Sequence, residues 1–147
     1  MGLLGDIKHA FTGGGATVTA TVTDARRAAT ATVVVEATAH TNMKISSVYV
    51  LVRATSTRET NHRGAVSDET TTVYEEKHYL AAEQELVEGQ SYTWRGQVSI
   101  PEQLFSSPGH RLRFSGHDWE ARAGLDVVGN DPDSGWQLFS VFDAAHP

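Results

Sequence analysis

The segment Trp119–Val141, WEARAGLDVVGNDPDSGWQLFSV, most constrains what this chain can fold into. Its first part alternates between polar and apolar residues, and one side carries Trp119, Ala121, Ala123, Leu125 and Val127. Seven turn-forming residues follow at 129–135, and the segment closes on apolar Trp136, Leu138 and Val141. The segment therefore predicts a half-buried strand, a turn-rich loop and a second strand.

Runs with strand character recur along most of the chain. We expect strands at 16–23, 30–38, 44–56 and 90–100, one strand or two within 70–86, and a loop or hairpin tip at 56–69. About eight short strands separated by turn signals are typical of two packed antiparallel sheets. The sequence thus predicts an all-β, immunoglobulin-like sandwich, with its three tryptophans, Trp94, Trp119 and Trp136, packed in the core.

The first residues follow a different period. Leu3, Leu4, Ile7 and Phe11 recur at helical spacing, which predicts a short amphipathic helix over 1–12. A glycine hinge at 13–15 separates it from a single domain over 16–147. Because so short a helix is marginal in water, it must dock somewhere: on its own sandwich, on a neighbouring subunit, or on a membrane surface. Its four apolar residues are therefore candidate interaction residues, and a membrane is the least favoured of the three sites because only Lys8 is cationic on the polar face.

Charge and composition exclude several classes of function. A net charge of −6 argues against a nucleic-acid partner, since phosphate binding needs a basic surface. The absence of cysteine excludes disulfides and thiol chemistry, and favours the cytoplasm. Neither the glycines at 13–15 nor Ser106 and Ser107 have the neighbours that a phosphate loop or a nucleophile elbow requires. We expect no enzymatic activity and no cofactor.

One acidic loop could hold calcium. Asp126, Asn130, Asp131 and Asp133 supply oxygen ligands near one another, although the spacing of a calcium-loop motif is missing. Turn capping by these short polar side chains is the simpler interpretation. We therefore expect no metal, and keep these four residues as the calcium candidates.

Four segments carry a resemblance to a known family: the short apolar start, the Val-Tyr-Val-Leu-Val core at 48–52, YTWRGQVSIP at 92–101, and the segment Trp119–Val141. Together they resemble the arrestin-like superfamily, in particular the amino-terminal domain of bacterial sporulation-control Spo0M-like proteins. The resemblance implies a non-catalytic adaptor or scaffold that binds proteins through sheet edges and loops.

The chain departs from that family in two ways. The family usually has two sandwich domains where this chain has one, and DARRAA at 24–29 lacks the expected turn. The resemblance therefore implies a protein-interaction module, either an adaptor or scaffold or a self-assembling structural subunit whose partner is another protein or itself. The alternative is a small-ligand or calcium-binding module that uses the loop at 130–133.

Overall fold

All the regular structure that the computed structural model describes is β-sheet, and it describes residues 15–105, 111, 112, 114 and 116–143. The strands are β1 (Ala16–Thr23), β2 (Thr30–Ala39), β3 (Met43–Ile45), β4 (Ser47–His62), β5 (Ala65–Ala81), β6 (Gln84–Leu86), β7 (Ser91–Ser99), β8 (Leu104–Phe105), β9 (Arg111–Leu112), β10 (Asp118–Asp126) and β11 (Gln137–Phe139). No helix in these ranges could cross a membrane.

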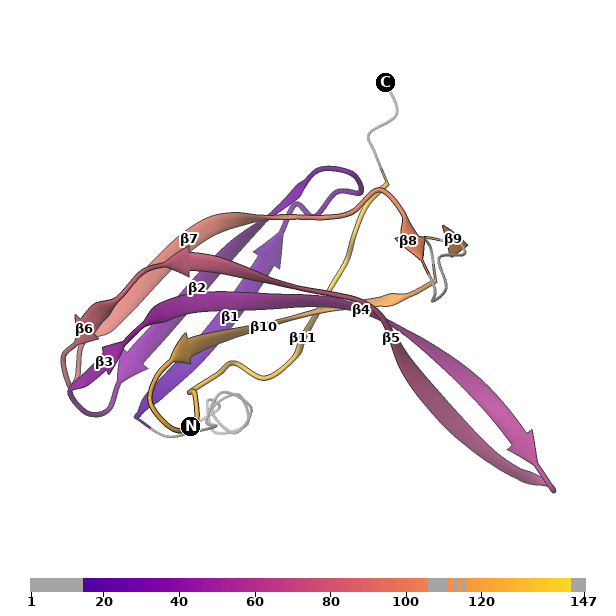
Figure 1. Ribbon diagram of the computed structural model, residues 1–147, viewed down its shortest axis with the longest axis horizontal. Helices are drawn as coiled ribbons and strands as arrows, with labels where there is room; N and C mark the ends of the chain where they lie inside the picture. Colours follow the sequence, from indigo (N-terminus) through magenta and orange to yellow (C-terminus); the bar gives the residue numbers. More distant parts are fainter. Residues whose placement is uncertain (1–14, 106–110, 113, 115, 144–147) are drawn as a thin grey trace, which may run out of the picture.

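Two antiparallel sheets form the body of the molecule (Figure 1). One has the order β1-β2-β7 and the other the order β11-β10-β4-β5. In β2 every second residue is buried, including Val33 and Val35, because side chains alternate between the two faces of a strand. The same alternation buries Val50 and Val52 in β4.

The core lies between these two sheets. Val18, Val33 and Val35 from the first sheet and Val50 and Ala121 from the second belong to one buried cluster. The inner face of β10 carries Trp119, Ala121, Ala123 and Leu125, all buried, as the sequence predicts. Valine and alanine side chains from both sheets, with Trp119 and Leu125 of β10, fill this core.

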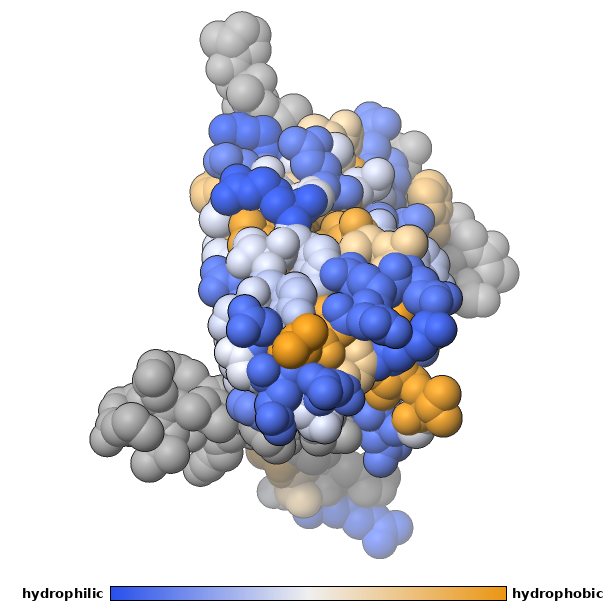
Figure 2. Space-filling model, turned by 90° about the vertical axis from the view of Figure 1, so that its left-hand side faces the viewer, coloured by the Kyte–Doolittle hydropathy of each residue, from blue (hydrophilic) through white to orange (hydrophobic). Residues whose placement is uncertain are grey.

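Short strand pairs lie at the two ends of the sandwich. β3 pairs with β6 at one end, and β8 pairs with β9 at the other (Figure 1). Figure 2 looks onto the end that carries β3 and β6, where apolar residues form small patches among hydrophilic ones. Small, scattered patches are ordinary for a protein surface.

The expectations for individual segments have mixed outcomes. The strands predicted at 16–23, 30–38 and 90–100 are present, whereas the segment 44–56 is divided between β3 and β4, which lie in different sheets. The segment 70–86 holds the second part of β5 and all of β6. The segment 56–69 is a hairpin tip, but it consists of regular paired strand rather than a loop. The predicted helix over 1–12, with Leu3, Leu4, Ile7 and Phe11, lies outside the described residues, as do the first two glycines of the hinge.

Candidate functional site

A two-stranded arm extends beyond the sandwich. Strands β4 and β5 stay paired for eight further rungs past a bulge at Ala54/Thr55, from Thr55↔Thr72 to His62↔Ala65. Figure 1 shows this ribbon leaving the body of the molecule with no sheet on either face. Every described side chain from residue 57 to residue 72 is exposed. None of the described side chains from residue 57 to residue 72 therefore belongs to the hydrophobic core.

The arm ends in a tight turn at Arg63 and Gly64. Both residues have positive φ, 53° and 80°, as in the type I′ turns that join two strands with two residues. The glycine adopts this backbone without steric cost. Close to the turn, Val66 is 61% exposed. The tip thus presents a cation and an apolar side chain to solvent.

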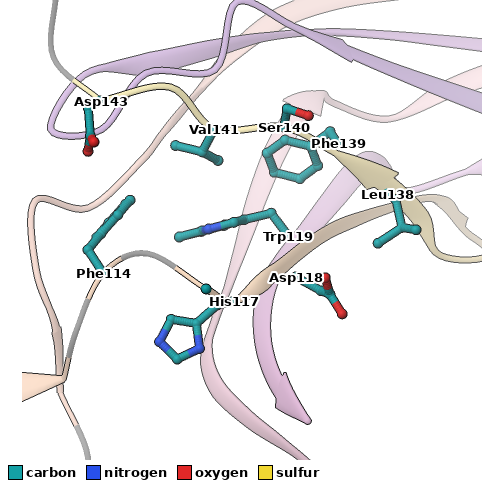
Figure 3. Close-up of a pocket in the computed structure, with 10 residues that line it drawn as sticks. Phe114, His117, Asp118, Trp119, Leu138, Phe139, Ser140, Val141 and Asp143 are labelled. Atoms are coloured by element: carbon teal, nitrogen blue, oxygen red, sulfur yellow. The ribbon is translucent and has the colours of Figure 1, made fainter.

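A pocket lies where the arm leaves the sandwich (Figure 3). Its volume is about 470 Å³, and its lining comes from the start of β10, from residues just before it, and from residues between 138 and 143 in and after β11. Asp118 and Trp119 of β10 line it, and they pair directly with Thr55 and Ala54 at the base of the arm.

The floor of this pocket is aromatic. The Trp119 ring lies 5.5 Å from that of Phe114, 6.2 Å from that of Phe139 and 5.7 Å from that of Tyr74, centroid to centroid. Such tilted arrangements are favourable for aromatic rings. Leu138 lines the same pocket and is 72% exposed. The sequence places it among the apolar residues of the closing strand, and the face that β11 turns inward carries Phe139.

The rim of the pocket carries two carboxylates and one cation. Asp118 is exposed, whereas Asp143 pairs with Arg27 across 3.5 Å, and the guanidinium of Arg27 lies 4.3 Å from the centre of the Phe114 ring. Because Arg27 compensates the charge of Asp143, the pocket fits an apolar side chain whose neighbouring cation is placed at Asp118.

The outer face of the second sheet carries a separate aromatic cluster. The guanidinium of Arg53 lies 3.7 Å from the centre of the Trp136 ring, and that of Arg122 lies 5.0 Å from it. Arg53 also pairs with Glu120 at 3.0 Å. The prediction that Trp136 packs in the core is therefore wrong, because these cations hold the indole on the solvent side of the sheet.

Tyr49 crosses the same outer face and lies over Gly124. A side chain at Gly124 would overlap the Tyr49 ring, so glycine makes room for the ring. The Tyr49 hydroxyl donates a hydrogen bond to Asp131 Oδ2 at 2.7 Å. Burial raises the pKa of Tyr49, and the hydrogen bond to Asp131 raises it further.

Of the calcium candidates, Asp126 is the last residue of β10, and Asn130, Asp131 and Asp133 lie in the loop between β10 and β11. The carboxylates of Asp131 and Asp133 accept hydrogen bonds. Asp131 accepts from Tyr49 and, through Oδ1, from the Val127 amide at 3.0 Å. Asp133 Oδ1 accepts from the amide of Gly135 at 2.7 Å, two residues further along, as in an Asx turn. Asn130 is exposed and Asp126 is half-buried.

No group of three or more metal-ligating side chains occurs in the part of the chain that the structure describes. The calcium site stays a prediction with no geometric support. Neither the pocket nor the aromatic character of its floor could be found from the sequence, because its walls come from segments that only the fold brings together. The sequence indicated the arm in part, because β-branched residues, which favour strands, lie on both sides of the Arg63–Gly64 turn.

Comparison with known proteins gives the fold. No family model and no curated protein sequence matches the chain. Among solved structures, the sporulation control protein Spo0M from Bacillus subtilis matches with a TM-score of 0.59 and 12% identity, over 90% of this chain and 51% of Spo0M. The chain has a Spo0M-like fold. This confirms, for the fold, the resemblance seen in the sequence.

The chain spans about half the length of Spo0M. CsgH from R. palustris also matches, with a TM-score of 0.31 and 13% identity over 80% of this chain and 88% of CsgH, and at that score it carries no argument.

Proposed function

We propose that this protein is a non-catalytic protein–protein interaction module that acts as an adaptor or as the subunit of an assembly. The observation that carries the proposal is the β4–β5 arm, which extends past the core with all its described side chains from residue 57 to residue 72 in solvent. The Spo0M-like fold agrees with a regulatory or structural role.

The energetics of the arm support a binding role. An isolated two-stranded hairpin is marginally stable at best in water, since each ordered residue costs about 1–2 kcal/mol of backbone entropy. Beyond Thr55 the arm buries no described side chain that could offset this cost. Contact with a partner would supply the missing burial.

Shortening the arm tests this function. Because Ser56 pairs with Thr71, residues 57–70 can be replaced by Asn-Gly, which closes the ribbon with a type I′ turn. We compare the full chain, this variant and a variant that lacks residues 1–12, which carry the predicted helix. The measurements are solution mass by light scattering and the proteins retained from an extract of the source cells.

The proposal predicts that the full chain self-associates or retains a defined partner protein. The variant with the shortened arm should lose this binding and keep the melting temperature of the full chain. If only the loss of residues 1–12 abolishes binding, the helix rather than the arm is the interaction element. A full chain that is monomeric at every concentration and retains no protein would refute an interaction role altogether.

A further inference from the structure

The arm tip and the pocket have complementary chemistry. The tip presents Val66, 61% exposed, beside the exposed cation Arg63. The pocket presents an aromatic floor around Trp119 and an exposed carboxylate, Asp118, at its rim. An apolar side chain next to a positive charge thus matches an apolar cavity next to a negative charge.

The tip cannot reach the pocket of its own chain. Asp118 pairs with Thr55 at the base of the arm, and the tip lies seven residues further along β4. At the rise of an extended strand, this places the turn roughly 23 Å beyond the pocket. Figure 1 shows the ribbon running away from β10 and β11, the strands that line the pocket.

The size of the pocket also suits the tip. A volume of about 470 Å³ lies in the range of cavities that enclose small ligands, so an aliphatic side chain and part of a two-residue turn fit inside it. Leu138 at the pocket is 72% exposed, and an inserted apolar side chain would remove it from water.

We propose that the arm tip of one copy docks into the pocket of a second copy, with Val66 against the aromatic floor and Arg63 against Asp118. This inference rests on the proposed interaction role and names the partner as the chain itself. Tip and pocket are different surfaces, so a single contact leaves a free pocket on one copy and a free tip on the other. The assembly therefore either closes as a dimer in which each copy's tip enters the other's pocket, or continues as a ring or an open filament.

A charge exchange tests the contact. We compare the full-length chain with Val66→Asp, Arg63→Glu and Asp118→Arg, each at a range of concentrations by sedimentation velocity. All three positions are exposed, so the substitutions leave the core intact. Val128→Asp, at a fully exposed valine in the β10–β11 loop, and Arg95→Glu, on the outer face of β7, are the matched controls.

We expect the wild-type chain and both controls to self-associate with the same dissociation constant. Each tip or pocket variant should have a dissociation constant at least about tenfold higher. Arg63→Glu alone places two carboxylates together at the contact, and Asp118→Arg alone places two guanidinium groups there. An equimolar mixture of these two variants should regain association, because the glutamate introduced at the tip of one then meets the arginine introduced at the pocket of the other.

Failure of this inference differs from failure of the proposed function. If the wild-type chain self-associates but the tip and pocket variants match it, or the mixture fails to recover, the tip-to-pocket contact is refuted and the interaction role stands. If the wild-type chain stays monomeric, the tip-to-pocket contact is refuted. The proposed function is then decided separately, by whether the full chain retains a different protein that the variant with the shortened arm does not.

Discussion

The packing of Tyr49 on Gly124 predicts a large effect from a single methyl group. In Gly124→Ala the new Cβ would overlap the Tyr49 ring, so the ring must move away from the sheet. The Tyr49 hydroxyl bonds to Asp131 at 2.7 Å, and Asp131 in turn accepts from the Val127 amide. Displacement of the ring therefore breaks the link between β4 and the loop that follows β10.

The expected loss of stability can be estimated term by term. Overpacking at a filled site costs about 1–3 kcal/mol. Loss of a hydrogen bond to a charged acceptor costs about 1.5 kcal/mol. Replacement of glycine by alanine within a strand returns about 0.5–1 kcal/mol through lower backbone entropy in the unfolded chain. We expect a net decrease of about 1.5–4 kcal/mol in the free energy of unfolding.

Urea unfolding followed by tryptophan fluorescence measures this decrease. Gly96→Ala is the matched control: the new Cβ would meet only Leu80 Cδ2, the end of a flexible side chain that can turn aside. It should therefore cost less than about 1 kcal/mol. In a Tyr49→Val background, where the ring is absent, Gly124→Ala should be neutral or stabilising. A Gly124→Ala protein as stable as the wild type, or equally destabilised in both backgrounds, would refute the reasoning.

Three further predictions concern polar groups. Ser134→Ala should lower the free energy of unfolding by about 1–3 kcal/mol in urea, because the buried Ser134 Oγ accepts from the Ala123 amide at 3.0 Å. Arg53→Ala should cost about 1–2 kcal/mol and expose Trp136 to a fluorescence quencher, because Arg53 both pairs with Glu120 and covers the indole. Lys44→Ala, which breaks a solvent-exposed ion pair with Glu83, should leave the urea midpoint unchanged. Millimolar calcium should leave the melting temperature of the wild type unchanged. Asp131→Ala should lower the melting temperature equally with and without calcium, because the Asp131 carboxylate accepts hydrogen bonds from two protein donors. A melting temperature that calcium raises in the wild type but not in Asp131→Ala would instead support a metal site.

The strands could be predicted because their signal is local. Alternation on Trp119–Leu125 and on 90–100 follows from the two-residue period of a strand, which depends on nothing outside the segment. The same alternation, together with the motifs at 48–52 and 92–101, was enough to indicate a Spo0M-like sandwich.

Properties that depend on the order of strands could not be predicted. The tryptophan at 136 looks like a core residue in its own segment, and only the position of Arg53 and Arg122 on neighbouring strands places it on the outer face. Leu138 and Phe139 are adjacent apolar residues, and which of them faces inward is fixed by the register of β11 on β10.

Local sequence was sufficient to locate the strands and the side chains on the inner faces of β2 and β10, because alternation is a short-range property of the backbone. It was not sufficient to show that β4 and β5 continue past the core as an arm, or that the segments around 114–119 and 138–143 meet in a pocket at its base. These features arise from pairing between residues far apart in the chain, where the burial gained by the whole sheet, rather than the preference of any one segment, fixes the arrangement.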